Sequence, residues 1–295
     1  MSTNNEYQEL RQSLEILGVQ SGDIILLKGD LSEVGLVGGS PKESRDLIFK
    51  VLWDAIGGEE QGTIITSAFT QAFFKWNLTD FVFDQTSPSK SGGAITKYFL
   101  QHPRSVRSEH PTNSFIALGK FASELLEGHD ETSRPYSPVG KVIERNGRVL
   151  SFGTVADPPD FMTGHYAQQE AGLTTRTVLK FLTGVKYRKN DEIKVYEVKE
   201  AGGCTRGHHI VYSEYVRLRK LRTVFFGNAY SISMLAKDAF EIAYAMHKKN
   251  PRAFICKDSH CFSCRGTWFW NMRAWPMYYM RNSWRILNKM VRPDV

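Results

Sequence analysis

Residues 23–27 read Asp-Ile-Ile-Leu-Leu, and this short apolar run decides how the chain around it folds. A compact run of this length and composition is typical of a buried β-strand. Upstream, leucines recur at helical spacing between residues 10 and 17 and end before a glycine. Downstream, a Ser-Pro pair opens a second helix over residues 41–56. The chain therefore begins as helix, strand and helix.

The same alternation continues along the first half of the chain. Short apolar runs that predict strands are separated by segments with helical periodicity. We expect strands at 63–66, 114–118 and 148–152, and helices at 94–100 and 121–126. Alternating helices and short strands favour a layered α/β domain.

Beyond about residue 174 the pattern changes. Residues 178–185 and 193–198 predict antiparallel strands around a turn at 189–191. A helix over about residues 231–247 follows. We therefore expect a mixed α+β C-terminal part, without internal repeats or a low-complexity linker.

The composition is that of an ordinary globular protein of 295 residues, with 41% hydrophobic and 23% charged residues. No window approaches about 18 uninterrupted apolar residues, and the N-terminus is polar and acidic. We expect neither a spanning helix nor a signal peptide, and a cytoplasmic protein. The four cysteines then favour reduced thiols or a metal site over disulfides.

Charge is distributed unevenly along the chain. Residues 201–295 carry 16 basic and 5 acidic side chains, whereas residues 1–100 carry 8 basic and 13 acidic ones. A basic surface attracts nucleic acid, anionic lipid or a phosphorylated small molecule. A solvated face without any partner is the alternative.

The loop over residues 28–41 leaves the first strand and enters a helix. Its glycines permit close backbone approach, and free amides at the helix start favour an anion. The spacing matches neither a P-loop nor the dinucleotide fingerprint. The loop is either a phosphate or pantetheine cradle or a plain structural turn.

Two histidines are candidates for moving a proton near neutral pH. His165 is followed five positions later by Glu170, and these positions are about 140° apart around a helix. The two can pair only across a loop or a distorted turn. His110 precedes Pro111, which favours an extended conformation. Each histidine is either catalytic or a hydrogen-bonded structural residue.

Several of these segments carry a family resemblance. Residues 107–119 (RSEHPTNSFIALG), Gly128-His129, 137–140 (SPVG) and 163–167 (TGHYA) follow the order and spacing of one signature. The chain resembles the aminoglycoside 3-N-acetyltransferase family, also called antibiotic N-acetyltransferases, over about residues 7–175. The resemblance implies a layered α/β catalytic domain of that type, which we place at 1–255. A Cys- and Trp-rich basic extension would follow at 256–295.

The resemblance also implies an activity and a site. The family transfers an acetyl group directly from acetyl-CoA to a primary amine of an amino sugar. His165 matches the catalytic histidine, and as general base it would accept the proton that the amine must lose. Glu170 would orient the imidazole. The residues matching the coenzyme A site are Asp30, Leu31, Ser32, Gly38 and Gly39, with His110, Ser114 and Phe115 flanking the pantetheine.

This chain departs from the family at some positions. Asn113 and Gln168 stand where many members have histidine and glutamate, and Lys28 stands where a histidine is common. Because glutamine cannot stabilise an imidazolium by charge, either Glu170 or a residue such as Asp84 replaces the missing carboxylate, or the substrate differs. Asp84 and Gln168 are also candidates for binding the substrate.

The basic C-terminal third directs our expectation of the substrate. Phosphates suit it better than a polycationic antibiotic does, so we expect a nucleotide-linked or lipid-linked amino sugar of surface-polysaccharide biosynthesis. The alternatives are an aminoglycoside 3-N-acetyltransferase conferring resistance and a non-catalytic relative that binds coenzyme A. A nucleic-acid-binding module lacks any recognisable motif, and we expect no nucleic acid partner.

Two features of residues 256–295 remain. Cys256, His260, Cys261 and Cys264 have a density compatible with tetrahedral zinc, with Cys204 as a remote ligand, but no second cysteine pair follows. We expect free thiols and no metal. Aromatic residues interleaved with arginines over 268–292 suit peripheral membrane contact. Packing on the core or on a second subunit, as in a homodimer, is the alternative.

Overall fold

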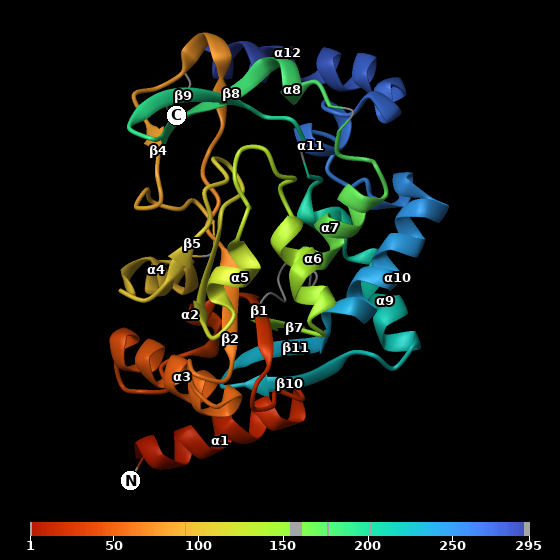
Figure 1. The fold of residues 1–295 in the computed structure, drawn as a ribbon. Coiled ribbons are helices and arrows are strands. Elements are labelled where there is room, and N and C mark those ends of the chain that lie inside the picture. The colour runs from red at the N-terminus through yellow and green to blue at the C-terminus, as the bar shows by residue number, and fades with distance from the viewer. Residues whose placement is uncertain (1, 92, 154–160, 176, 201, 292–295) are drawn as a thin grey trace.

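A seven-stranded mixed sheet forms the centre of the molecule in a computed structural model that describes residues 2–91, 93–153, 161–175, 177–200 and 202–291 (Figure 1). Its strands run in the order β10-β11-β7-β1-β2-β6-β5. Their bounds are β1 (Ile24–Gly29), β2 (Thr63–Ser67), β5 (Val106–Arg107), β6 (Phe115–Gly119), β7 (Arg148–Phe152), β10 (Arg222–Phe226) and β11 (Ala229–Leu235).

Strand β1 lies in the middle of this sheet and is parallel to both of its neighbours. Leu26 pairs with Ile65 of β2 on one side and with Val149 of β7 on the other. Helices cover both faces of a parallel sheet, so the four buried residues of this strand, Ile24 to Leu27, are all apolar. The strand predicted at 23–27 is therefore confirmed.

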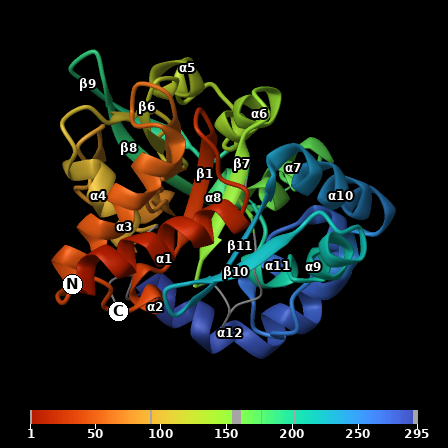
Figure 2. The ribbon, with the colours of Figure 1, turned by 90° about the horizontal axis from the view of Figure 1, so that it is seen from below.

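One face of the sheet is covered by the N-terminal helices, which cross it in Figure 2. These are α1 (Ser2–Ile16), α2 (Leu31–Val34), α3 (Pro41–Ile56) and α4 (Gly93–Gln101). Helix α3 begins at the predicted place because the Ser40 hydroxyl accepts a hydrogen bond from the Glu43 amide. It ends at Gly57, whose φ of 83° is left-handed.

The opposite face is covered by five helices, which share one apolar core with it. They are α5 (Ala122–Leu126), α6 (Ser137–Glu144), α7 (Met162–Glu170), α9 (Ile210–Arg217) and α10 (Ala236–Lys249). The sheet therefore lies between two helical layers. This confirms the predicted layered α/β fold.

A small second sheet lies at the end of the molecule away from α1 (Figure 1). It contains β3 (Phe73–Phe74), β4 (Val82–Phe83), β8 (Thr183–Lys189) and β9 (Glu192–Glu197). The β8–β9 turn places Asn190 and Asp191 at positive φ, which these residues tolerate. The predicted antiparallel pair is confirmed, although a short helix, α8 (Leu179–Leu182), occupies part of the first predicted strand.

The helix predicted from residue 231 begins later than expected. Residues 231–235 belong to β11, where Ile232 pairs with Ser151 of β7. The backbone groups of β7 on that side would otherwise lack partners in the sheet, and this pairing outweighs the local helical pattern. Helix α10 starts at Ala236.

The C-terminal segment is hydrogen-bonded to Leu173 and Val178. The Trp270 indole donates a hydrogen bond to the Leu173 carbonyl at 3.2 Å, and the Val178 amide donates to the Thr267 carbonyl. This segment contains α11 (Phe262–Arg265), η4 (Phe269–Ala274) and α12 (Trp275–Val291), and the earlier short turns are η1 (Lys75–Asn77), η2 (Thr205–Gly207) and η3 (Pro251–Phe254).

The aromatic side chains of this segment divide between the core and the surface. Trp268 and Tyr278 are buried, whereas Met280 and Trp284 of α12 are 70% and 73% exposed. Packing in the core therefore accounts for Trp268 and Tyr278, but not for Met280 and Trp284. Membrane contact, a homodimer and the boundary at residue 255 stay predictions, and Arg292 lies outside the described residues. No described helix combines the length and hydropathy that crossing a membrane requires.

A buried arginine joins the two sheets. The Arg107 guanidinium is 5% exposed and donates hydrogen bonds to the carbonyls of Gln85, Ser87 and Ala68 and to the Ser114 hydroxyl. Burial lowers the pKa of Arg107 to about 10, while the charge of Asp84 opposes that shift. Arg107 remains charged and holds the segment after β4 against β6.

We predict that Arg107→Ala lowers the free energy of unfolding by at least about 3 kcal/mol, since several buried carbonyls lose their donor together. Arg104→Ala is the control, because Arg104 is 62% exposed and pairs with Glu59. Its effect should stay within about 0.5 kcal/mol. Urea denaturation followed by circular dichroism measures both. Equal losses for the two variants would contradict the role given to Arg107.

Candidate functional site

The candidate site lies where β1 and β7 end together. The Asp30 amide donates a hydrogen bond to the Phe152 carbonyl at 3.0 Å, directly after both strands. Gly29 has a φ of 151°, and a Cβ there would stand 2.5 Å from the same carbonyl oxygen. Only glycine permits this approach. In open α/β sheets, ligands bind outside the carboxyl ends of such strands.

His165 lies in the first turns of α7, the helix that follows β7, and is 8% exposed. Its ring stacks on Tyr136 with centroids 5.4 Å apart and planes at 19°. The His208 ring lies 4.6 Å away on another segment. A Cβ added at Gly202 would come within 3.5 Å of Nδ1 of His165. Close packing therefore fixes the orientation of this imidazole.

The neighbouring His208 is uncharged at neutral pH. Burial lowers its pKa well below the usual value, and positive charge on His165 and Lys28 lowers it further. His208 therefore stays neutral beside the His165 ring.

Gln168 connects α7 to a distant loop. Its side-chain oxygen accepts a hydrogen bond from the Gly203 amide at 2.7 Å, and the residue is 2% exposed. A Cβ at Gly203 would stand 2.9 Å from the Gln168 amide nitrogen. The glutamine thus holds residues 202–203 against the helix that carries His165.

Glu170 lies at the end of α7 and faces Arg134. The Arg134 guanidinium donates to Glu170 at 2.9 Å and to Glu200 at 2.8 Å. Asp84 lies in the turn after β4, where its carboxylate accepts hydrogen bonds from Thr86. These hydrogen bonds lower the pKa of Asp84. The described hydrogen bonds of Glu170 and Asp84 thus lead to other partners than His165.

The predicted coenzyme loop folds back on itself. The Asp30 carboxylate accepts hydrogen bonds from the amide and hydroxyl of Ser32 and caps the short helix α2. The Gly38 amide donates to the Ser44 hydroxyl at 3.2 Å. A Cβ at Gly38 would stand 2.7 Å from the Glu43 backbone, so this approach to α3 requires glycine.

A pocket of about 480 Å³ opens beside this loop, and several positively charged side chains line it. Leu31 and Ser32 line it on one side, and the residues of α3 and α4 that line it include Lys42, Arg45 and Lys97. Cationic side chains of this kind suit the phosphates of a nucleotide. Sequence reasoning missed these three residues because they lie on two helices far apart in the chain.

The other predicted coenzyme residues are buried in the core. His110, Ser114 and Phe115 are each 0% exposed. His110 accepts hydrogen bonds from the amides of Thr112 and Asn113, and its ring stacks on His129 at 5.0 Å. Burial, together with the charge of His129, lowers the pKa of His110 to about 3. The side chains of these three residues therefore pack inside the protein.

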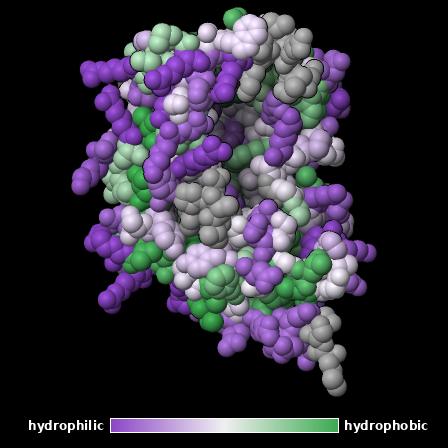
Figure 3. Space-filling view, turned by 180° about the vertical axis from the view of Figure 1, so that it is seen from behind, coloured by the Kyte–Doolittle hydropathy of each residue, from purple (hydrophilic) through white to green (hydrophobic). Residues whose placement is uncertain are grey.

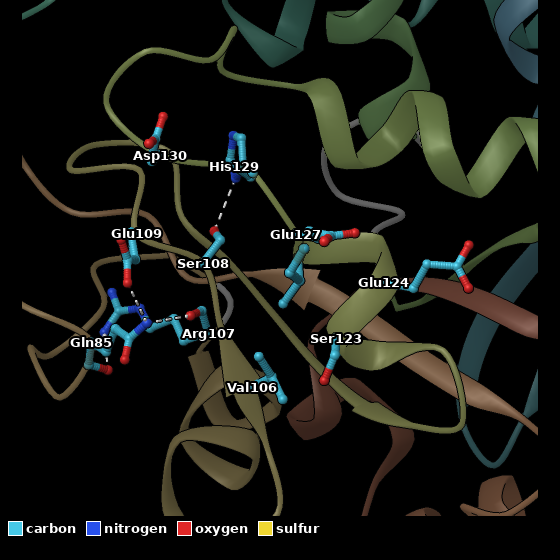
Figure 4. Close-up of a pocket in the computed structure, with 12 residues that line it drawn as sticks. Gln85, Val106, Arg107, Ser108, Glu109, Ser123, Glu124, Glu127, His129 and Asp130 are labelled. Carbon is cyan, nitrogen blue, oxygen red and sulfur yellow. Dashed lines mark hydrogen bonds between the residues drawn. The ribbon is translucent and has the colours of Figure 1, made fainter.

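An acidic pocket of about 610 Å³ lies on the outer side of His129 (Figure 4). Carboxylates of Glu109, Glu124, Glu127 and Asp130 line it. The Ser108 hydroxyl is 2.9 Å from Nδ1 of His129, and burial lowers the pKa of that histidine to about 4. A neutral histidine among carboxylates suits a cationic ligand. Seen from behind, the molecule carries mainly hydrophilic side chains in its upper half and several hydrophobic patches in its lower half, with a hollow above the middle (Figure 3).

The structure therefore brings some predicted residues together and separates others. His165 and Gln168 share helix α7, whereas the loop with Asp30 begins at the shared end of β1 and β7. The rings of Tyr136 and His208 pack around His165. Tyr136 directly precedes the signature segment at 137–140, but no sequence pattern singled out His208. No spacing rule predicted that these rings would meet.

Comparisons with known proteins agree with this architecture. The family model described as aminoglycoside 3-N-acetyltransferase matches residues 26–248. Aminoglycoside N(3)-acetyltransferase VIII of Streptomyces fradiae is 28% identical over 181 residues, covering 55% of this chain and 60% of that relative. The chain thus spans less than two thirds of that protein's length.

Solved structures show the same fold. The apoenzyme of aminoglycoside acetyltransferase AAC(3)-IVa superposes with a TM-score of 0.70 at 21% identity, over 88% of this chain and 94% of that one. A binary complex of AAC-IIIb with CoASH gives a TM-score of 0.66 at 20% identity, over 82% and 96%.

The expected role in surface-polysaccharide biosynthesis is wrong, because the family model and the relatives are named for aminoglycosides. The charge argument behind it fails because the net charge of a stretch of sequence does not show which side chains line a pocket. The described residues that line the two pockets above all lie between residues 31 and 130, and none of them belongs to the basic C-terminal third. The chain belongs to the aminoglycoside 3-N-acetyltransferase family.

Proposed function

We propose that the protein transfers the acetyl group of acetyl-CoA to the 3-amino group of an aminoglycoside, with His165 as general base. The observation that carries this proposal is the place of His165. It lies on α7, the helix that follows β7 in the chain, where the rings of Tyr136 and His208 pack around it. The family model matches residues 26–248, which include this helix and the coenzyme loop.

The proposed step requires a deprotonated amine. His165 accepts the ammonium proton, and the nitrogen lone pair attacks the thioester carbonyl carbon. A C–N bond forms and the C–S bond breaks, so coenzyme A leaves as the thiolate. The thiolate takes up the second proton that the nitrogen loses as the amide forms, and His165 returns the first proton to solvent. The small exposure of His165 limits competing water at the base.

Packing holds the base in place in this proposal. Tyr136 stacks on the imidazole, and Gln168 fixes the loop at Gly203 beside it. We therefore assign Gln168 to positioning, whereas Glu170 stabilises the end of α7 through Arg134. Asp84 stays a candidate for substrate binding.

The charges that line the two pockets suit the two proposed substrates, acetyl-CoA and an aminoglycoside. Lys42, Arg45 and Lys97 place positive charge around the pocket beside the coenzyme loop, as the phosphates of acetyl-CoA require. The carboxylates of Glu109 and Glu127 line the pocket in Figure 4 and favour the approach of a polycation.

Substrate specificity is the first test. Release of free coenzyme A thiol should occur with acetyl-CoA and kanamycin-type aminoglycosides, and not with nucleotide-linked amino hexoses. NMR of the product should show acetylation at the 3-amino group. Coenzyme A binding without thiol release from any aminoglycoside would contradict the proposal and favour a non-catalytic relative.

Replacing the base is the second test. His165→Ala should lower kcat by about 10² to 10⁴, since general-base catalysis contributes that much, while acetyl-CoA affinity stays the same. His102→Ala is the control, because His102 lies at the far end of α4 and faces Glu59. Steady-state kinetics and calorimetry measure the two effects. A kcat equal to that of the His102 variant would remove His165 from the mechanism.

Removing a cation from the coenzyme pocket is the third test. Arg45→Gln should weaken acetyl-CoA binding by about tenfold, which corresponds to the loss of one favourable phosphate contact. Lys50→Gln removes the same charge from the same helix, but Lys50 pairs with Asp54 outside the pocket. Isothermal titration calorimetry measures the acetyl-CoA affinity of both variants. Identical affinities for the two variants would exclude this pocket as the phosphate site.

A further inference from the structure

All four cysteines of the chain meet at one point, although 60 residues separate the first from the last. Cys204 precedes η2, Cys256 follows η3, and Cys261 and Cys264 lie at α11. Their Sγ atoms all lie within 4.8 Å of one another. We propose that these four thiolates bind a structural zinc ion.

The sulfur geometry fits this ion. A zinc–sulfur bond is about 2.3 Å long, so the sulfurs of an ideal tetrahedron lie about 3.8 Å apart. The four sulfurs lie within 4.8 Å of one another, so one ion between them can reach all four after small side-chain adjustments. All four cysteines are free thiols. Cys261 and Cys264 are also separated by two residues, a usual ligand spacing in zinc sites.

The surroundings favour negatively charged sulfur. Cys256 and Cys264 are 2% and 0% exposed, and buried thiolates need a compensating cation. The Cys256 amide donates to Sγ of Cys264 at 3.5 Å. The Arg265 guanidinium lies 4.0 Å from Sγ of Cys256 and donates to its carbonyl. Zn²⁺ with four thiolates has a net charge of about −2, which Arg265 partly offsets.

The ligand set differs from the one that local sequence spacing suggested. The His260 ring is hydrogen-bonded to Asn282 at 2.8 Å, outside the group of four sulfurs. Cys204 takes the fourth position instead. With four protein ligands and no open position, zinc would be structural and not catalytic.

The site would connect the C-terminal segment to the candidate active site. Cys204 directly follows Gly203, whose amide is bonded to Gln168 of α7. A metal that fixes Cys204 therefore also fixes the loop that packs on His165. This inference is independent of the proposed function, because zinc binding is measured without turnover.

Metal analysis of the full-length chain, produced with zinc in the medium, tests the proposal. We expect about one zinc per chain after dialysis. Cys204→Ser should lower the zinc content at least about tenfold, because three thiolates and a hydroxyl bind zinc far more weakly. His260→Ala is the matched control and should keep the full content.

Two measurements on the unaltered chain remain decisive if Cys204→Ser does not fold. Cobalt substitution should give a sulfur-to-cobalt charge-transfer band and the intense visible bands of a tetrahedral site. Adding a strong chelator should make the four thiols reactive towards Ellman's reagent and lower the melting temperature. A purified chain that contains no zinc, holds iron in its place or has freely reactive thiols before chelation would overturn the proposal.

Discussion

The pairing of β1 with β2 on one side and β7 on the other is the constraint on which the rest of the structure depends. It buries an apolar strand between two helical layers and brings the ends of β1 and β7 together. Gly29 makes this possible, because a side chain there would collide with the Phe152 backbone. The coenzyme loop begins directly after this end, at Asp30, and α7 with His165 is the next described element after β7. The proposed coenzyme loop therefore depends directly on this strand pairing.

The layered fold could be predicted because its strands and helices are local patterns. The run at 23–27 and the cap at Ser40 are sufficient to place β1 and α3. The strand at 231–235 could not be predicted, since its partner β7 lies about 80 residues earlier in the chain. The same limit applies to the site. His165 was found through a local signature, whereas Tyr136, His208 and Cys204 reach their places only through tertiary packing.

The net charge of long stretches of sequence gave a wrong expectation of the substrate. The excess of basic residues in 201–295 lies outside the described linings of the acidic pocket and of the pocket beside the coenzyme loop. The cations that line the pocket at the coenzyme loop come instead from the N-terminal third, whose sum is acidic. Local arrangement, and not net charge, therefore separates a pocket suited to phosphates from a pocket suited to a polycation.

A crystal structure of the chain with coenzyme A and a kanamycin-type aminoglycoside would test the central claim most directly. We predict that the 3-amino nitrogen lies within about 3.2 Å of a ring nitrogen of His165. We also predict that the coenzyme phosphates lie in the pocket lined by Lys42, Arg45 and Lys97. An aminoglycoside bound with its 3-amino group among Glu109 and Glu127, and the coenzyme sulfur away from His165, would contradict the account.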